Sequence, residues 1–402
     1  MIVLVINSGS SSIKFHLYKL PGESLLAFGK VEKQGNGDAH YNYNFQGTLI
    51  QRKQNSFSFS EGLGKIFSEI INPENKCLNS LEEIDVVGHR LIHGGEQGKD
   101  CAIISDSLLK YMNSCISLAP LHYPANIEGI MVVKKLIPRV LQAGVFDTAF
   151  HQTMPKKAFL YGIPIKWYKE HQIRRYGFHG TSHQYVSQRA CKITGMWLEK
   201  SKIISCHLGN GASLAAIKDG KSVDTSMGLT PVEGLLMGSR SGDIDAGALM
   251  YIQQNYSLSP EEIQEMINKK GGLLGLSGIS SDYRDVLKAA KQGNSDAQIA
   301  LEVFYYRIIK YIGAFAAVLN GLDILIFTGG IGENSSETRK AVCKGLGFLG
   351  IKISKKMNKT LNGCETVISR AKSKVKVIIM PSNEELMIAR HVAEIAKSKK
   401  KN

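Results

Sequence analysis

The sequence repeats one pattern of apolar and polar residues, first at 3–19 (VLVINSGSSSIKFHLYK) and again at 203–221 (IISCHLGNGASLAAIKDGK). In each copy an apolar run leads into a turn of glycine, serine and asparagine and then into a second apolar run, which predicts two strands joined by a hairpin. A duplicated strand–turn–strand unit favours two similar domains that each present a turn to a shared ligand. Two unrelated hairpins are the alternative interpretation, because turns of small polar residues are common.

The chain as a whole alternates predicted strands with predicted helices. Strands are expected at 1–7, 13–20, 86–92, 143–149 and 324–328, and helices at 105–117, 125–136, 259–271 and 295–319. Two of these helices carry start signals, because Ser259 and Glu262 form a capping box around Pro260, and Ser295 and Gln298 form a second box. The alternation indicates an α/β fold.

Composition argues against several classes of protein. Apolar residues make up 43% and charged residues 21% of the chain, as in ordinary soluble globular proteins. The seven cysteines are scattered without a C-x-x-C pair, which argues against a disulfide framework or a zinc ribbon and for a reducing compartment. The chain opens on MIVLVIN without a basic segment, so no signal peptide is expected, and no apolar run is long enough for a membrane span. We therefore expect a cytoplasmic protein without a membrane partner.

The formal net charge of +15 raises the question of nucleic-acid binding. Residues 352–402 contain 13 basic residues against 4 acidic ones, so much of the excess is concentrated near the C-terminus. These basic residues lack interleaved aromatic residues and a recognition motif, as is typical of a solvated face or tail. No nucleic-acid partner is expected.

Three turns rich in small residues have the composition of phosphate-binding loops. They are 7–12 (NSGSSS), with Lys14 just inside the following strand, 209–213 (GNGAS), and 327–334 (FTGGIGEN), which precedes a helix expected at Ser336. Small residues let backbone N–H groups approach an anion, and a nearby lysine adds charge. Plain structural turns are the alternative, and the absence of G-x-x-x-x-G-K-[ST] excludes the Walker arrangement.

Two arginines lie among small residues, Arg90 in GHRLIHGG and Arg240 in MGSRSGD. A guanidinium with small neighbours is sterically free to form a two-pronged hydrogen-bonded pair with a carboxylate or a phosphate. A structural ion pair is the alternative for each of them. Both are candidates for binding an anionic substrate.

Histidines and carboxylates supply further candidates. His179 and His183 have the i, i+4 spacing of a metal site, but the glycine and threonine after His179 argue against a helix there, and no glutamate completes an H-E-x-x-H motif. No transition-metal site is expected. Asp147 and Glu384 each follow an apolar strand, where α/β sheets place ligand-binding groups.

Taken together, these motifs resemble those of the acetate kinase family, within the fold superfamily of sugar kinases, heat-shock chaperones and actin. The resemblance covers residues 1–391 and depends on ten motifs in order: INSGSSSIKF, GHRLIHGGE, APLHYPAN, VFDTAFHQTMP, RRYGFHGTSH, HLGNGAS, MGSRSGDID, GISSDYRD, FTGGIGENS and SNEELMIAR. It implies two duplicated actin-like (ribonuclease H-like) domains around a nucleotide cleft. The expected domains are 1–149, with a C-terminal helix at 386–402 packed back on it, and 150–385, which would carry the adenosine site.

The resemblance also implies a role for each matching position. Arg90 and Arg240 would hold the carboxylate and the transferred phosphoryl group, and His179 would stabilise the transition state. The remaining implied positions are His122 and Asp147 for catalysis; Ser10, Ser12, Lys14, His207, Asn210 and Gly211 for the phosphates; Asp282, Arg284, Gly330, Ile331 and Asn334 for the adenosine; Ile92, Leu121, Phe178 and Pro231 for the acyl methyl; and Asn7 and Glu384 for the metal.

The activity implied by the resemblance is reversible transfer of a phosphoryl group from ATP to acetate, giving acetyl phosphate and ADP. It would require Mg²⁺, with Mn²⁺ as the alternative metal, and would take place in a homodimer. The chemistry suits the residues, because a carboxylate is already ionised and needs no general base, while arginines and histidines offset repulsion between two anions. Direct in-line transfer is the simplest mechanism, and a phosphoenzyme on Glu384 or another carboxylate is its alternative. The alternative functions are a propionate or other short-chain acyl kinase and a non-catalytic nucleotide-binding module.

Four positions depart from the family pattern. Tyr123 stands where asparagine is expected, Ala246 where proline is expected, Asn320 where glycine is usual, and Ile92 where valine is common. The first three flank motifs, whereas Ile92 bears on the length of the acyl chain that is accepted.

Overall fold

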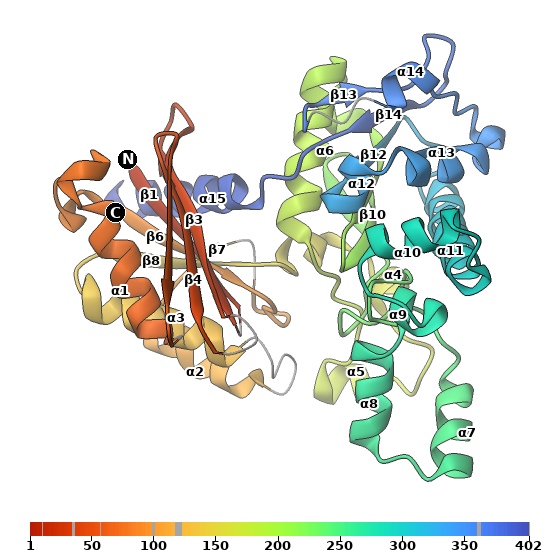
Figure 1. Cartoon of the computed structure of the whole chain (residues 1–402), viewed down its shortest axis with the longest axis horizontal. Helices are drawn as coiled ribbons and strands as arrows, with labels where there is room; N and C mark the ends of the chain where they lie inside the picture. The colour runs from red at the N-terminus through yellow and green to blue at the C-terminus, as the bar shows by residue number, and fades with distance from the viewer. Residues whose placement is uncertain are drawn as a thin grey trace. The chain divides into compact units, whose positions relative to one another are not determined.

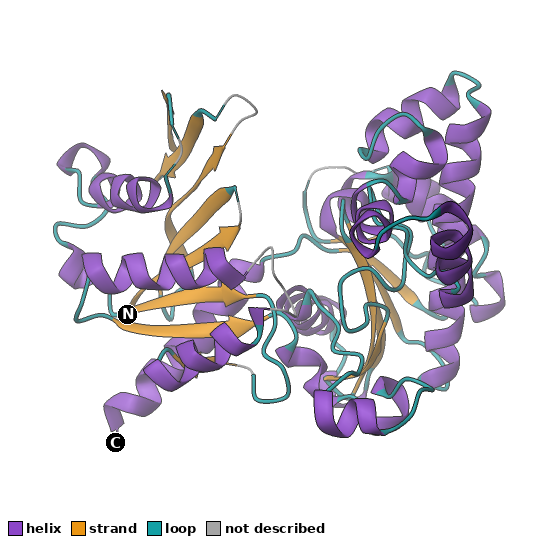
Figure 2. Ribbon diagram, turned by 90° about the horizontal axis from the view of Figure 1, so that it is seen from below, coloured by secondary structure: helices purple, strands orange, loops and turns teal. Residues whose placement is uncertain are grey.

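The computed structural model describes residues 1–9, 11–33, 37–56, 58–98, 101–116, 123–359 and 363–401. The chain divides into two compact units, Met1–Ala149 with Asn383–Asn402, and Phe150–Ser382 (Figure 1). Each unit is built on a single sheet against which helices pack (Figure 2). The predicted α/β class is therefore confirmed.

The first unit contains an eight-stranded sheet in the order β5-β4-β3-β2-β1-β6-β8-β7. Its strands are β1 (Ile2–Gly9), β2 (Ser12–Lys19), β3 (Ser24–Lys33), β4 (Ala39–Phe45), β5 (Thr48–Gln54), β6 (Val86–Leu91), β7 (Cys101–Ile103) and β8 (Leu141–Phe146). Its helices are α1 (Phe59–Ile70), α2 (Asp106–Ser114), α3 (Tyr123–Leu136) and α15 (Glu384–Lys401).

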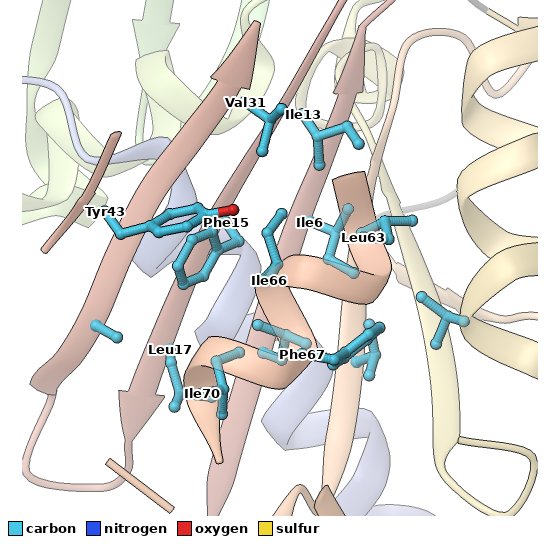
Figure 3. Close-up of a cluster of buried hydrophobic side chains, with 14 of the residues drawn as sticks. Ile6, Ile13, Phe15, Leu17, Val31, Tyr43, Leu63, Ile66, Phe67 and Ile70 are labelled. Carbon is cyan, nitrogen blue, oxygen red and sulfur yellow. The ribbon is translucent and has the colours of Figure 1, made fainter. Parts of the chain in front are cut away.

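Helices cover both faces of this sheet because the central strand β1 is apolar on both faces. Leu4 and Ile6 belong to the core under α1 and α3, where side chains of α1 interdigitate with those of β2, β3 and β4 (Figure 3). The opposite face packs against α15, which contacts β1, β6 and β8. Gly88 in β6 allows this approach, because a Cβ atom there would lie 3.0 Å from Cγ1 of Val392 in α15. The last helix of the chain thus completes the core of the first unit.

The second unit contains a six-stranded sheet in the order β11-β10-β9-β12-β14-β13. Its strands are β9 (Lys202–Leu208), β10 (Ala212–Lys218), β11 (Lys221–Thr225), β12 (Ile324–Thr328), β13 (Thr366–Val367) and β14 (Lys376–Ile379). Its helices are α4 (Lys156–Phe159), α5 (Lys166–His171), α6 (Gly180–Thr194), α7 (Ala246–Tyr256), α8 (Pro260–Lys269), α9 (Gly272–Ser277), α10 (Tyr283–Lys291), α11 (Ser295–Val318), α12 (Gly329–Asn334), α13 (Ser336–Lys344) and α14 (Lys355–Asn358).

The two sheets share one strand plan, which explains the sequence repeat. β1 pairs antiparallel with β2 and parallel with β6, and β9 pairs antiparallel with β10 and parallel with β12. The order β3-β2-β1-β6-β8 of the first sheet therefore recurs as β11-β10-β9-β12-β14 in the second. The two hairpins are equivalent elements of duplicated folds, and the alternative of unrelated hairpins is wrong.

Helix starts follow the capping signals with one exception. The capping box of Ser259 and Glu262 is present at the start of α8, as predicted. The predicted box at Ser295 is wrong, because Asn294 caps α11 and its side-chain oxygen accepts a hydrogen bond from the backbone N–H of Ala297 at 2.8 Å. Asparagine caps helices as well as serine does, so the residue that precedes the box takes its place. No helix in the described ranges has the length and apolar character needed to cross a bilayer.

Candidate active site

Three parallel strands of the first unit end at one edge of its sheet and bring polar residues together. β6 lies between β1 and β8, with Ile6 beside His89 and Leu91 beside Phe146 in the register. Asn7, Arg90 and Asp147 therefore lie at the carboxyl ends of neighbouring strands, the edge at which α/β sheets bind ligands. Glu384, the first residue of α15, reaches the same corner.

Arg90 is held by carboxylates at this corner. Its Nε and Nη2 atoms donate to the two carboxylate oxygens of Asp147 at 2.9 and 2.7 Å, and Nη2 lies 3.3 Å from Oε2 of Glu384. Burial by itself would lower the pKa of Arg90, but the Asp147 and Glu384 carboxylates raise it above the ordinary value, so the guanidinium stays charged. Asp147 occupies the edge formed by Nε and Nη2, so the structural ion pair named as the alternative for Arg90 is present, and binding of a ligand by Arg90 stays a prediction.

The donor set of this corner fits a magnesium ion that takes most of its ligands from phosphate and water. Two carboxylates, Asp147 and Glu384, face the single guanidinium of Arg90, which leaves an excess of negative charge. The amide of Asn7 and the carboxylate of Glu384 supply the hard oxygen donors that Mg²⁺ prefers. Within the described residues no three acidic, histidine or cysteine side chains form a metal cage. Proteins commonly hold Mg²⁺ through one or two carboxylates together with substrate phosphates.

Three of the remaining predicted residues of the first unit lie in β2 or directly after β6. Lys14 in β2 is the register partner of Asn7, and Ser12 is the partner of Gly9 across the same hairpin. Ile92 follows β6 and packs, half-buried, against the apolar cluster around Leu91 and Phe146. The predicted residues Ser10, Leu121 and His122 lie outside the described residues.

A pocket of about 600 Å³ lies at the carboxyl ends of β9 and β12 in the second unit. Its walls include the glycine turn after β9, the short helix α12 and the start of α10, which contribute Asn210, Asp282, Arg284, Gly330, Ile331 and Asn334. All six were predicted to lie around a nucleotide, and the structure brings them to one cavity of the size that binds small ligands. Asp282 caps α10 and holds Arg284 in an ion pair at 2.6 Å.

Two residues that support this pocket were not found from the sequence. Buried Arg339 donates to the carbonyls of Gly332 and Glu333 at 2.8 and 2.9 Å, and Glu333 accepts from the N–H of Gly329 at 2.9 Å. Residues 329–334, predicted as a turn, form the helical turn α12. The sequence does place a glutamate in the FTGGIGEN motif and an arginine shortly after it. The local sequence does not indicate which backbone carbonyls or amides these two side chains would bind.

A cationic corner adjoins the turn at 209–211. A Cβ atom on Gly211 would lie 3.6 Å from Nη1 of Arg240 and 3.7 Å from Cε1 of His179. Because residue 211 is glycine, no side chain of its own lies between the turn and these two groups. The ring of His179 stacks on that of His207 with centroids 4.4 Å apart. Burial lowers the pKa of Arg240, which still leaves it cationic at neutral pH. In the part of the chain that the structure describes, the Arg240 guanidinium has no carboxylate partner, in contrast to Arg90.

The expectation that no helix follows His179 is wrong. Gly180 begins α6, and His179 is its N-cap with φ of +58°. This left-handed backbone conformation, uncommon for a residue with a side chain, sets the ring outside the helix. His183 lies one turn into α6 and is fully buried. Its two ring nitrogens lie 2.9 and 2.8 Å from the hydroxyls of Ser205 and Ser213, so it belongs to a hydrogen-bond network.

The other two residues predicted to surround the acyl methyl group, Phe178 and Pro231, lie in the second unit. Phe178 is buried, and its carbonyl accepts a hydrogen bond from Nε2 of His151 at 3.0 Å if that nitrogen carries the proton. Pro231 is half-buried in the loop after β11. The structure thus fixes the position of Phe178 next to His179 through a buried histidine.

Glycine-turn amides and an unpaired arginine are the groups with which phosphoryl-transfer proteins hold phosphates. The pocket beside them has room for a nucleoside. The fold and the site together indicate a nucleotide-dependent phosphotransferase.

Comparison with known proteins identifies the family of this chain. A model of the Acetokinase family matches residues 2–390. The acetate kinase of Carboxydothermus hydrogenoformans is 49% identical over 400 residues, which cover 99% of this chain and 100% of that protein. The Porphyromonas gingivalis acetate kinase structure has a TM-score of 0.92 at 46% identity, over 98% of this chain and 99% of that one. A propionate kinase structure from Francisella tularensis has a TM-score of 0.90 at 41% identity, over 98% and 99% of the two chains. The chain belongs to the acetokinase family.

The departures from the family pattern have simple structural explanations. Asn320 adopts a left-handed conformation with φ of +52°, which asparagine tolerates better than other side chains when it replaces glycine. Ala246 is the first residue of α7 after the cap Asp245, a position that accepts proline or alanine. Tyr123 is fully buried at the start of α3, and its hydroxyl donates to the carbonyl of His93.

Proposed function

We propose that this protein transfers a phosphoryl group reversibly between ATP and acetate, giving ADP and acetyl phosphate. The observation that carries the proposal is the turn at 209–211. On one side this turn lines a nucleotide-sized pocket, and on the other it lies beside Arg240 and His179. A nucleotide in the pocket would therefore extend its phosphates toward an unpaired cation.

The reaction that suits these residues is direct in-line transfer. An oxygen of the acetate carboxylate attacks the γ-phosphorus, the bond between that phosphorus and the β,γ-bridging oxygen breaks, and ADP leaves with the electron pair. No proton has to be removed from the nucleophile, because the carboxylate is already ionised. Arg240 and His179 would stabilise the charge on the transferred group, and Arg90 would hold the carboxylate through Nη1, the nitrogen that Asp147 does not engage. A phosphoenzyme on Glu384 is less suited, since Arg90 lies 3.3 Å from that carboxylate.

The proposal includes a metal, an assembly state and a compartment. Asn7 and Glu384 would hold Mg²⁺, or Mn²⁺ as the alternative, and the bound ion would neutralise charge on the nucleotide phosphates. We assign the protein to the cytoplasm, because its seven cysteines are all free thiols, as in reducing compartments. A homodimer is proposed from the family to which the chain belongs.

The test of this function is a trapping assay on the purified full-length protein. With ATP, Mg²⁺ and acetate, hydroxylamine should convert acetyl phosphate to a hydroxamate, and omission of acetate should abolish the signal. The Arg240→Ala variant serves as the control for contaminating activity. ATP binding without any hydroxamate would contradict the proposal and would favour a non-catalytic nucleotide-binding module.

Ile92 gives a prediction about acyl chain length. If Ile92 packs against the methyl group, Ile92→Ala should raise the kcat/KM of propionate relative to that of acetate by about tenfold, the value of one methylene contact. Wild type should prefer acetate, because isoleucine fills more space than valine and overpacking costs about 1–3 kcal/mol. The measurement is kcat/KM for acetate, propionate and butyrate at saturating magnesium-ATP.

A matched control for this prediction is Ile104→Ala. Ile104 is another half-buried isoleucine that packs on the same apolar cluster as Ile92, so its truncation removes the same atoms and should leave the acyl preference unchanged. A preference for propionate in wild type would replace the acetate assignment by a propionate kinase. An unchanged ratio in Ile92→Ala would show that Ile92 does not line the acyl site.

A further inference from the structure

A buried chain of side chains behind His179 is not used by the mechanism described so far. The hydroxyl of Ser213 in β10 lies 2.8 Å from Nδ1 of His179 and 2.8 Å from Nε2 of His183. The other ring nitrogen of His183 lies 2.9 Å from the hydroxyl of Ser205 in β9. Ser205, Ser213 and His183 are fully buried, so this chain runs from His179 into the interior of the unit.

Strand register explains why these groups meet. Ser213 is opposite His207, and Ser205 is opposite Ala215, two residues along β10. Since side chains alternate along a strand, both serines lie on the same face of the sheet. The helix α6 packs against β9, and its first turn brings His183 onto this face between the two hydroxyls.

Counting donors restricts the protons of this chain. The Ser213 hydroxyl has one proton, so it donates to only one of its two histidines and accepts from the other. Burial, followed by the neighbouring His151 and His207, lowers the pKa of His183 well below the ordinary value, so His183 is neutral, with one N–H and one lone pair. If Ser213 accepted from both rings, its own buried proton would have no acceptor in the chain.

Two directions of the chain are possible, and the second leaves the buried proton of Ser205 without an acceptor in the chain. In the first, Ser205 donates to Nδ1 of His183, Nε2–H of His183 donates to Ser213, and Ser213 donates to Nδ1 of His179. A neutral His179 then carries its proton on Nε2. In the second, every bond of the chain is reversed, Nδ1–H of His179 donates to Ser213, and Nε2 carries a proton when His179 is an imidazolium.

We propose that Ser213 is a positioning residue that keeps Nε2 of His179 protonated so that this atom donates a hydrogen bond to the transferred phosphoryl group. The proposal rests on the function proposed above. The edge of the ring formed by Cε1 and Nε2 lies toward the turn and Arg240, since a Cβ on Gly211 would lie 3.8 Å from Nε2 of His179 and 3.6 Å from Nη1 of Arg240. Ser213 thereby sets the tautomer of a residue that would contact the substrate.

The two serines provide a matched pair of variants. Ser213→Ala and Ser205→Ala each remove one buried hydroxyl from one nitrogen of His183, but only Ser213 contacts His179. Ser213→Ala should lower kcat by about 10–100-fold, the range found when a group that orients a ligating histidine is removed. Its KM values for ATP and acetate should stay within about twofold, because the lost hydrogen bond matters in the transition state. Ser205→Ala should keep kcat within about threefold of wild type, and Ser213→Thr should restore most of the activity.

A spectroscopic measurement follows the tautomer directly. In protein labelled with ¹⁵N-histidine, the wild-type resonances of His179, assigned by their loss in His179→Gln, should report a proton on Nε2. Ser213→Ala should shift them toward the Nδ1–H tautomer, and Ser205→Ala should not. Equal losses of kcat in the two alanine variants with similar melting temperatures, or an unchanged His179 tautomer in Ser213→Ala, would overturn the proposal. If wild type makes no acetyl phosphate, the proposed function fails, and the tautomer measurement alone then decides the role of Ser213.

Discussion

Arg240→Ala should lower turnover by about 10²–10³-fold, which corresponds to the loss of one preorganised donor to the charge of a transition state. Its melting temperature should remain that of wild type, because Arg240 has no carboxylate partner in the described structure and its removal leaves no buried charge unpaired. The measurement is kcat in the hydroxamate assay together with thermal unfolding. Arg240→Lys should recover little activity, because a single ammonium does not reproduce the guanidinium fork.

Arg90→Ala is the instructive contrast. Asp147 is 2% exposed and would keep a buried carboxylate without its partner, so this variant should lose about 3 kcal/mol of unfolding free energy as well as activity. The double variant Arg90→Ala/Asp147→Asn also removes the unpaired buried carboxylate. Relative to Arg90→Ala, it should regain much of the unfolding free energy but none of the turnover. If Arg240→Ala and Arg90→Ala both retained near-normal turnover, the assignment of the active site would be wrong.

His179→Asn should lower kcat by about 10²-fold while the KM for ATP changes by less than about threefold. His179 contacts Ser213 and stacks on His207, and its ring is assigned to the transferred group and not to the nucleoside pocket. Asparagine is the suitable replacement, because residue 179 has φ of +58°, which asparagine adopts more readily than alanine. The variant therefore removes the imidazole without straining the start of α6.

His179→Ala provides the comparison for that choice. Its kcat should fall similarly, and its melting temperature should be lower than that of His179→Asn because alanine must adopt the left-handed conformation. Equal losses of ATP affinity and turnover in His179→Asn would make His179 part of the nucleotide site instead. Kinetics at varied ATP and acetate, with melting curves of both variants, separate these outcomes.

Much of the site could be predicted because its residues lie in contiguous motifs. Asn210, Gly330, Ile331 and Asn334 lie on glycine turns directly after strands, and both turns line the same pocket. Parallel strands end at one edge of a sheet, so polar residues that follow β9 and β12 are close in space although far apart in sequence. The positions of the motifs after strands were therefore enough to predict that these residues lie close together.

The partners of these residues could not be predicted. Arg90 is paired with Asp147, 57 residues further along, whereas the sequence motifs pointed to the two residues only as separate candidates. Glu333 and Arg339 look like ordinary charged residues of a helical segment, yet they bind the backbone of α12. Gly180 and Thr181 argued against a helix, whereas Gly180 begins α6.

What the sequence by itself determined is the duplicated α/β fold and the family. The repeat at 3–19 and 203–221 encodes equivalent hairpins, because the alternation of apolar and polar residues along a strand is a local property of the chain. Only the tertiary structure decided which arginine is free and which is paired, and that Ser213 links His179 to His183. The physical reason is that hydrogen bonds and ion pairs between distant residues depend on strand register and helix packing, which set distances that no local pattern contains.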